Sequence, residues 1–183
     1  MDGVPLKKPL KGLYRAFTLA DGSCFFHSLA AILDKDNYSL SDWKARRKIG
    51  LRLRKELVNP KAYEKWVRAN GYEGFGGLST QDACDPSVYA DDLLIAFCAE
   101  RLGLSLVLIR NKSEAYVRGV SNSDRTPVAL IAYVNNNHFE PILRCEGAPR
   151  VLALTHQVKD TLYATHHLHS ARSPYLESLC LLR

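Results

Sequence analysis

A cysteine set between a polar turn and an apolar helical segment restricts how this 183-residue chain can fold. Residues 21–29 read DGSCFFHSL, in which Asp-Gly is a common turn pair. Apolar residues at Phe25, Leu29 and Ile32 then follow helical spacing. Cys24 is therefore expected at a helix N-terminus, where unpaired backbone N–H groups and the dipole stabilise a thiolate. Because the thiolate is the nucleophilic form, the turn predicts a catalytic cysteine.

A histidine far along the chain supplies the second part of such a site. His138 lies in the run NNNHFE at residues 135–140, at the start of an expected strand. An early cysteine with a distant histidine and a nearby polar residue is the arrangement of a cysteine hydrolase. Side chains two apart on a strand share a face, so Glu140 is placed to orient the imidazole, with Asn136 or Asn137 as alternatives.

Composition is that of an ordinary globular domain, with 46% hydrophobic residues. The longest strongly apolar stretch, Leu93 to Ala99, is too short to span a bilayer, and we expect no signal peptide at the start. Five cysteines without regular spacing argue against a disulfide framework. A reducing compartment suits a working thiol, so we expect a cytoplasmic protein. We also expect the protein to be a monomer.

Ten cations crowd into residues 44–68 of a chain whose formal charge is +6. They are Lys44, Arg46, Arg47, Lys48, Arg52, Arg54, Lys55, Lys61, Lys65 and Arg68. One interpretation is an electropositive face for nucleic acid or an acidic partner. The preferred one is a solvated helix face, because no interleaved aromatic residues or nucleic-acid motif accompany the charges. Neither a nucleic-acid nor a membrane partner is expected.

The order of elements predicts an α+β fold, with helices in the first half and strands in the second. Helices are expected from Cys24, from Ser41-Asp42 to before Pro60, over Lys61 to Ala69, and from Asp85-Pro86 to Gly103. Strands are expected over Leu13 to Leu19, Ser105 to Ile109, Tyr116 to Gly119, Pro127 to Val134 and His138 to Leu143, the last two as a hairpin. We predict a flexible lead-in over 1–12, one domain over 13–155 and an extension of uncertain structure over 156–183.

The remaining thiols and imidazoles predict no metal site. Histidines at 156, 166, 167 and 169 match no closed zinc spacing. Cys98 is expected in the core and Cys84 beside a polar loop, while Cys145 and Cys180 lack a suitable turn or partner. His27 is interpreted as a packing or helix-surface residue, with an approach to the site as the alternative. No cofactor is expected because a thiol and an imidazole need none.

Three blocks of the sequence, in order, resemble the OTU (ovarian tumour) family of deubiquitinating cysteine proteases. DGSCFFHSL resembles its nucleophile motif, and the FFHS continuation resembles that of the viral members. The block from Val88 to Phe97, followed by the Gly103 turn and Leu104 to Ile109, resembles its helix-then-strand unit. NHFEPI at residues 137–142 resembles its histidine motif. The resemblance covers residues 14–145 and implies a papain-like fold with a central, mostly antiparallel sheet flanked by helices.

The resemblance also implies roles for individual residues. Cys24 would attack the carbonyl of the terminal glycine of ubiquitin or a similar modifier, where it is linked to a lysine or peptide amine, with His138 as the base and Asp21 in the active site. The chain departs from the usual pattern at Ser23 for Asn, Tyr89 for Trp and Glu140 for Asp or Asn. The oxyanion is expected to meet backbone N–H groups of Gly22, Ser23 and Cys24.

Substrate contacts are predicted at two places. The resemblance puts the aromatic ring of Phe139 in the channel for the glycine pair, beside Asn137. Acidic residues at Asp82, Asp85, Asp91 and Asp92 suit the arginines of the ubiquitin tail, with capping and solvation as the alternative.

Three functions remain open from the sequence. The first is a deubiquitinase countering ubiquitin-dependent host defence, in the cytosol of a host cell if the protein is viral or an effector. The second is a papain-like endopeptidase that processes its own polyprotein. The third is a non-catalytic ubiquitin-binding or nucleic-acid-binding module, which would have no need of Cys24 and His138.

Overall fold

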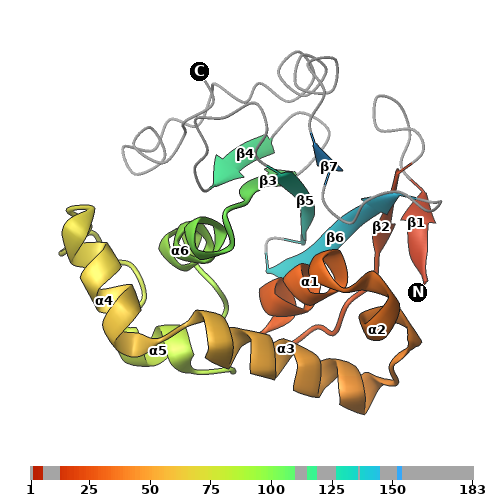
Figure 1. The fold of residues 1–183 in the computed structure, drawn as a ribbon, viewed down its shortest axis with the longest axis horizontal. Helices are drawn as coiled ribbons and strands as arrows, with labels where there is room; N and C mark the ends of the chain where they lie inside the picture. The colour runs from red at the N-terminus through yellow and green to blue at the C-terminus, as the bar shows by residue number, and fades with distance from the viewer. Residues whose placement is uncertain are drawn as a thin grey trace.

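In the part of the chain that the structure describes, helices cover one mixed sheet (Figure 1). The computed structural model describes residues 2–5, 13–109, 115–118, 127–135, 137–144 and 152–153. The strands are β1 (Gly3–Pro5), β2 (Leu13–Ala16), β3 (Ser105–Ile109), β4 (Ala115–Arg118), β5 (Pro127–Val134), β6 (His138–Arg144) and β7 (Leu152–Ala153). The helices are α1 (Cys24–Leu33), α2 (Lys35–Leu40), α3 (Trp43–Leu57), α4 (Pro60–Ala69), α5 (Thr80–Cys84) and α6 (Asp92–Leu102).

The sheet runs in the order β1-β2-β6-β5-β3-β4, and β7 pairs with β5 off this path. Among the described strands β3 and β5 pair in parallel, and the other pairs are antiparallel. The predicted α+β fold with a mostly antiparallel sheet is therefore confirmed. The predicted hairpin of the last two long strands is formed by β5 and β6.

Capping residues set the ends of the helices. The Asp42 carboxylate accepts the Ala45 N–H at 2.8 Å to start α3. Asn59 caps α4 with Pro60 as the first helical residue, in agreement with the prediction. Gly103, at φ 61°, ends α6 in the left-handed conformation that glycine adopts without strain.

Two expectations about helices were wrong or incomplete. Asp85 and Pro86 do not begin α6, because the Asp85 carboxylate accepts the backbone N–H and hydroxyl of Ser87 and closes a turn instead. Asp91 is the cap of α6. The short helices α2 and α5 were not predicted, since one or two turns leave little hydrophobic periodicity to detect.

The N-terminal residues depart from the expected flexible lead-in. Gly3–Pro5 forms the edge strand β1, which pairs with β2. A Cβ at Gly3 would lie 2.4 Å from the Arg15 carbonyl oxygen, so glycine permits this close approach. Residues 6–12 lie outside the described residues, as do the predicted extension 156–183 with its histidines, Cys145 and Cys180.

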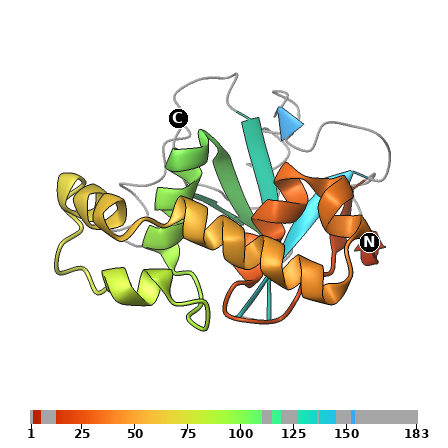
Figure 2. The same ribbon diagram turned by 60° about the horizontal axis from the view of Figure 1, so that its bottom comes forward.

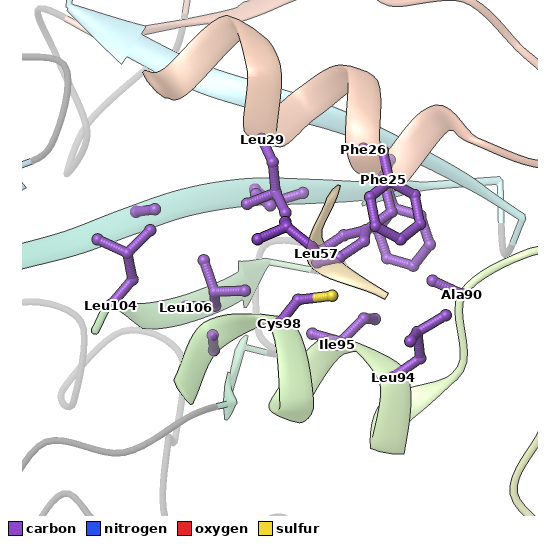
Figure 3. Close-up of a cluster of buried hydrophobic side chains, with 14 of the residues drawn as sticks. Phe25, Phe26, Leu29, Leu57, Ala90, Leu94, Ile95, Cys98, Leu104 and Leu106 are labelled. Atoms are coloured by element: carbon purple, nitrogen blue, oxygen red, sulfur yellow. The ribbon is translucent and has the colours of Figure 1, made fainter. Parts of the chain in front are cut away.

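The core joins the nucleophile helix to the rest of the fold. Helix α1 lies between β6 and α3 (Figure 1), and α3 runs on from α2 toward α4 (Figure 2). Figure 3 shows side chains of α1 pointing toward those of α6. Phe25 and Phe26 are fully buried there, and so is Cys98, as predicted. Because α1 is packed on both sides, its first residue is held on a rigid support. No helix within the described ranges is long and apolar enough to cross a bilayer.

Candidate active site

The turn before α1 is fixed by its own hydrogen bonds. Cys24 is the first residue of α1, and its N–H donates to the Asp21 carbonyl at 3.0 Å. The Ser23 N–H donates to Asp21 Oδ1 at 2.9 Å. A Cβ at Gly22 would lie 2.3 Å from the carbonyl carbon of Ser87, so only glycine fits at this point. The DGSC sequence therefore forms a tight turn that delivers the cysteine to the helix N-terminus.

A buried arginine, which the sequence analysis assigned to a solvated face, lies behind this turn. Arg54 of α3 is 2% exposed, and its guanidinium donates to the carbonyls of Gly22, Ala83 and Val88. The prediction of a solvated face is wrong for this residue, because packing of α3 against α1 and the 82–88 segment encloses the side chain. The exposed members of the same run include Lys44, Arg47, Lys48, Arg52 and Lys55.

The histidine is positioned by the β5–β6 hairpin. Asn135 adopts φ 53°, a left-handed conformation that asparagine tolerates, and the Asn137 N–H donates to the Val134 carbonyl at 3.2 Å. His138 thereby becomes the first residue of β6, paired with Val134. Its Nε2 lies 3.5 Å from Glu140 Oε1, so the two side chains share a face as predicted. Within the described chain, Nδ1 is buried and makes no hydrogen bond.

Phe139 joins the two halves of the site through its backbone. Its carbonyl accepts hydrogen bonds from the hydroxyls of Thr18, at 2.8 Å, and Ser28, at 2.9 Å. Its N–H is a hydrogen-bond donor that lowers the pKa of the Cys24 thiol, as do the N–H groups of Phe25 and Cys24 at the start of α1. The thiol at residue 24 therefore lies beside the residue that follows His138. Sequence reasoning missed Thr18 and Ser28, although Ser28 is four residues from Cys24 and so shares its helix face.

Burial shifts the pKa values of Cys24 and His138 in opposite directions. Burial raises the pKa of the Cys24 thiol, and the backbone N–H groups that stabilise a thiolate do not compensate for it. Burial also lowers the pKa of His138, although Glu140 and Asp21 act in the opposite direction. Both shifts oppose the stabilisation of a Cys24 thiolate that the helix N-terminus predicts, and the thiolate stays a prediction. Cys24 is 1% exposed, so loss of water outweighs the helix terminus.

The raised pKa of the Cys24 thiol predicts how alkylation of this residue depends on pH. Because the thiol pKa is raised above its usual value of 9.0, the thiolate fraction grows about tenfold per pH unit between pH 7 and 9. We expect the rate of carboxamidomethylation of Cys24, followed by mass spectrometry, to rise steeply over this range. A rate that is already constant below pH 7 would instead reveal an ion pair with His138 and contradict the prediction.

Glu140 connects the histidine to β2. Its Oε2 lies 2.7 Å from Arg15 Nε, while Oε1 faces His138. The Arg15 N–H is not aligned for a hydrogen bond, so the contact is an ion pair. The carboxylate is 8% exposed and is held between two basic side chains. Glutamate at this position therefore contacts the imidazole, in the place where the family usually has aspartate or asparagine.

Asp21 and His27 form a second contact beneath the turn. His27 Nε2 lies 3.3 Å from the Asp21 carboxylate, and the imidazole is fully buried. Burial lowers the pKa of His27, with Asp21 opposing it. A Cβ at Gly50 would lie 2.3 Å from the ring, which shows how tightly α3 packs here. His27 therefore has the packing role rather than a place on the helix surface, and it supports the carboxylate that braces the turn.

Comparison with known proteins identifies the fold. No protein-family model matches the sequence, and no curated protein sequence resembles it significantly. Solved structures do match. An OTU domain in complex with ubiquitin has a TM-score of 0.55 at 17% identity, over 86% of this chain and 85% of that one. The chain has the OTU fold.

Two viral domains with this fold agree with that assignment. The Hazara virus OTU bound to ubiquitin has a TM-score of 0.51 at 19% identity, over 74% of this chain and 83% of that chain. The OTU protease domain of Taggert virus has a TM-score of 0.51 at 14% identity, over 81% of this chain and 96% of that chain. The OTU fold that the three sequence blocks implied is thus shown by structure where identity is low.

Within this OTU fold, the side chains predicted to contact substrate are differently placed. The Phe139 ring is 4% exposed and packs on Phe25 and Tyr133, so it belongs to the core rather than to an open channel. Asn137 is exposed in the hairpin turn. Alternation along β6 turns this ring inward, away from the face of His138, and contact of Phe139 with substrate stays a prediction.

The acidic cluster is mostly engaged in local structure. Asp91 accepts the backbone N–H groups of Leu94 and Leu78, each at 2.8 Å, so its carboxylate serves as a cap. Asp82 accepts the hydroxyl of Ser79 at 2.6 Å, and Asp85 holds the Ser87 turn. Asp92 is exposed in the first turn of α6. Helix capping, the alternative for Asp85, is therefore the role of Asp91 instead, and contact of these carboxylates with substrate arginines stays a prediction. The described residues contain no group of three potential metal ligands.

Proposed function

We propose that this protein is a cysteine peptidase that cleaves the peptide or isopeptide bond after the terminal glycine of ubiquitin or a ubiquitin-like modifier. One observation carries the proposal. The Cys24 thiol, at the start of α1, lies beside the backbone N–H of Phe139, directly after His138. A thiol, an imidazole and a carboxylate in this order are the parts that nucleophilic hydrolysis of an amide requires. Ubiquitin is present in the Hazara virus OTU structure and in another matching structure.

The reaction follows from the groups present. As Nε2 of His138 faces Glu140, Nδ1 is the nitrogen left to take the proton from Cys24. The sulfur then attacks the glycine carbonyl, and the imidazolium returns the proton to the departing lysine or peptide amine. Water hydrolyses the resulting thioester, with His138 again as the base. Glu140 stabilises the imidazolium that forms in both steps, since it raises the pKa of His138.

The tetrahedral intermediate needs backbone donors. Of the three predicted N–H groups, that of Ser23 is already bonded to the Asp21 carboxylate, and that of Cys24 to the Asp21 carbonyl. The Gly22 N–H has no intramolecular acceptor among the described residues. We therefore assign the oxyanion to Gly22, with Cys24 as a shared donor, and leave Ser23 out of the set.

Trapping the nucleophile tests the proposal. Ubiquitin carrying a C-terminal electrophile is expected to form one covalent adduct, which peptide mass spectrometry assigns to Cys24. Half-buried Cys84 and fully buried Cys98 are internal controls that should remain unmodified. If no adduct forms with ubiquitin or its relatives and a longer precursor cleaves itself, the protein is a processing endopeptidase and the proposal is wrong.

The cellular setting is part of the same proposal. A peptidase that depends on a free thiol works in a reducing compartment, so we propose the cytoplasm. The resemblance of the nucleophile motif to viral OTU domains supports a role against ubiquitin-dependent host defence.

A further inference from the structure

Arg54 gathers backbone carbonyls from separate segments around one guanidinium. Nε and Nη2 donate to the Ala83 carbonyl at 3.1 and 2.9 Å, and Nη2 also reaches that of Asp82 at 3.3 Å. Nη1 donates to the carbonyls of Val88 at 2.8 Å and Gly22 at 3.1 Å. The nucleophile turn and the 82–88 segment are thus bound through a single side chain of α3.

The surroundings of this cation are unusual for a structural arginine. A buried charge is costly unless it is paired or fully hydrogen-bonded. No carboxylate oxygen in the described parts of the chain forms an ion pair with Arg54, so its compensation comes from backbone oxygens and from the Phe26 ring, 5.0 Å from the guanidinium carbon. Burial accordingly lowers its pKa. A position that needs so many donors from one planar group favours arginine over any other residue.

The contact with Gly22 acts on one peptide plane. The carbonyl of the Gly22–Ser23 peptide is held by Arg54, and the N–H of the same peptide is held by Asp21 Oδ1. The Ser23 hydroxyl fastens the turn further by donating to the Pro86 carbonyl at 3.2 Å. A peptide held at both ends cannot rotate, so the adjoining N–H groups of Gly22 and Cys24 keep their directions.

We propose that Arg54 is a positioning residue that locks the Gly22–Ser23 peptide plane and so keeps the oxyanion donors of the nucleophile turn aligned. This role rests on the proposed peptidase function for its effect on catalysis. Arg54 donates to backbone carbonyls of the turn and of the 82–88 segment, so its role is geometric. If Arg54 is lost, we therefore expect Cys24 to be alkylated at the usual rate while its acylation by substrate becomes slow.

Arg54→Lys tests the proposal, because lysine keeps the charge but cannot reach all these oxygens. With an aminocoumarin amide of ubiquitin as substrate, we expect kcat to fall about 10- to 100-fold, with KM within about 3-fold. Complete loss of an oxyanion donor costs about 10²- to 10³-fold in kcat, and misaligned donors retain part of that stabilisation. Alkylation of Cys24 should remain as in the unmodified protein.

Hydrogen exchange should become faster at the Ser23 amide of Arg54→Lys, because the peptide is no longer held at its carbonyl. Guanidinium ions, but not ammonium ions, should restore part of the activity of Arg54→Ala.

Arg46→Lys is the matched control. Arg46 lies on the same helix, donates to the carbonyls of Tyr38 and Ser39 at 2.9 and 2.7 Å, and lies over an aromatic ring. It does not contact the nucleophile turn, so its replacement should leave kcat and Ser23 exchange unchanged.

The kcat and the Ser23 amide exchange of Arg54→Lys together decide whether Arg54 is a positioning residue. An Arg54→Lys protein with unchanged kcat and unchanged exchange overturns the positioning role while ubiquitin cleavage stands. Equal losses in both variants, parallel to lower thermal stability, overturn it in favour of general structural support. If the unmodified protein does not cleave ubiquitin, the proposed function fails, and Ser23 exchange in Arg54→Lys alone decides whether the peptide is locked by Arg54.

Discussion

Cys24→Ala is expected to lower turnover of a ubiquitin-tail substrate by at least about 10⁴-fold, because removal of the nucleophile from such a site leaves only binding and oxyanion stabilisation. Alanine fits the buried space of Cys24 without a clash, because it lacks only the sulfur atom. We therefore expect the variant to fold and to bind ubiquitin non-covalently. Steady-state hydrolysis and calorimetric binding, measured on the same preparation, separate these two effects.

Cys84→Ala supplies the matched control. Cys84 is a free cysteine whose thiol donates to the Val58 carbonyl at 3.6 Å, on α5 rather than on the nucleophile helix. Its replacement should leave hydrolysis within about twofold, since a surface or half-buried thiol bond contributes little. Comparable losses in both variants would mean that Cys24 supports the fold and that the nucleophile lies elsewhere.

Local sequence signals account for the elements that carry the site. The DGSC turn predicted the start of α1, and helical spacing predicted its buried face, because Asp-Gly turns and apolar periodicity act over a few residues. The predicted hairpin put His138 at the start of a strand, and the structure forms its turn with Asn135 in the left-handed conformation. Cysteine and histidine could thus be assigned to their places before the fold was known.

Long-range packing decides what the sequence could not. Arg54 occupies a helix rich in exposed cations, and no local pattern separates it from Arg52 or Lys55. Its burial depends on the 82–88 segment, which is distant in sequence. The raised pKa of the Cys24 thiol has the same origin, because the helix N-terminus is visible in the sequence whereas the burial of Cys24 is not. The OTU fold was accessible from three blocks, but the bracing of its nucleophile turn was not.

His138→Gln is expected to lower kcat/KM by about 10³-fold, within the range that a general base contributes. The effect should be large because burial raises the pKa of Cys24, so without the imidazole almost no thiolate forms at neutral pH. Activity of the variant should then increase about tenfold per pH unit up to pH 9. The unmodified protein should instead keep its activity below pH 6.5, because burial lowers the pKa of His138 and the neutral base persists there.

Glu140→Gln gives the graded comparison for this pH profile. Since Glu140 raises the pKa of His138, its loss should lower that pKa further and move the acid limb of kcat/KM to lower pH, with about a tenfold loss of rate from a less well oriented ring. An acid limb that moves to higher pH would mean that the carboxylate does not act on the imidazole. A His138→Gln profile parallel to that of the unmodified protein would show that another group accepts the thiol proton, and the assignment of His138 as the base would be wrong.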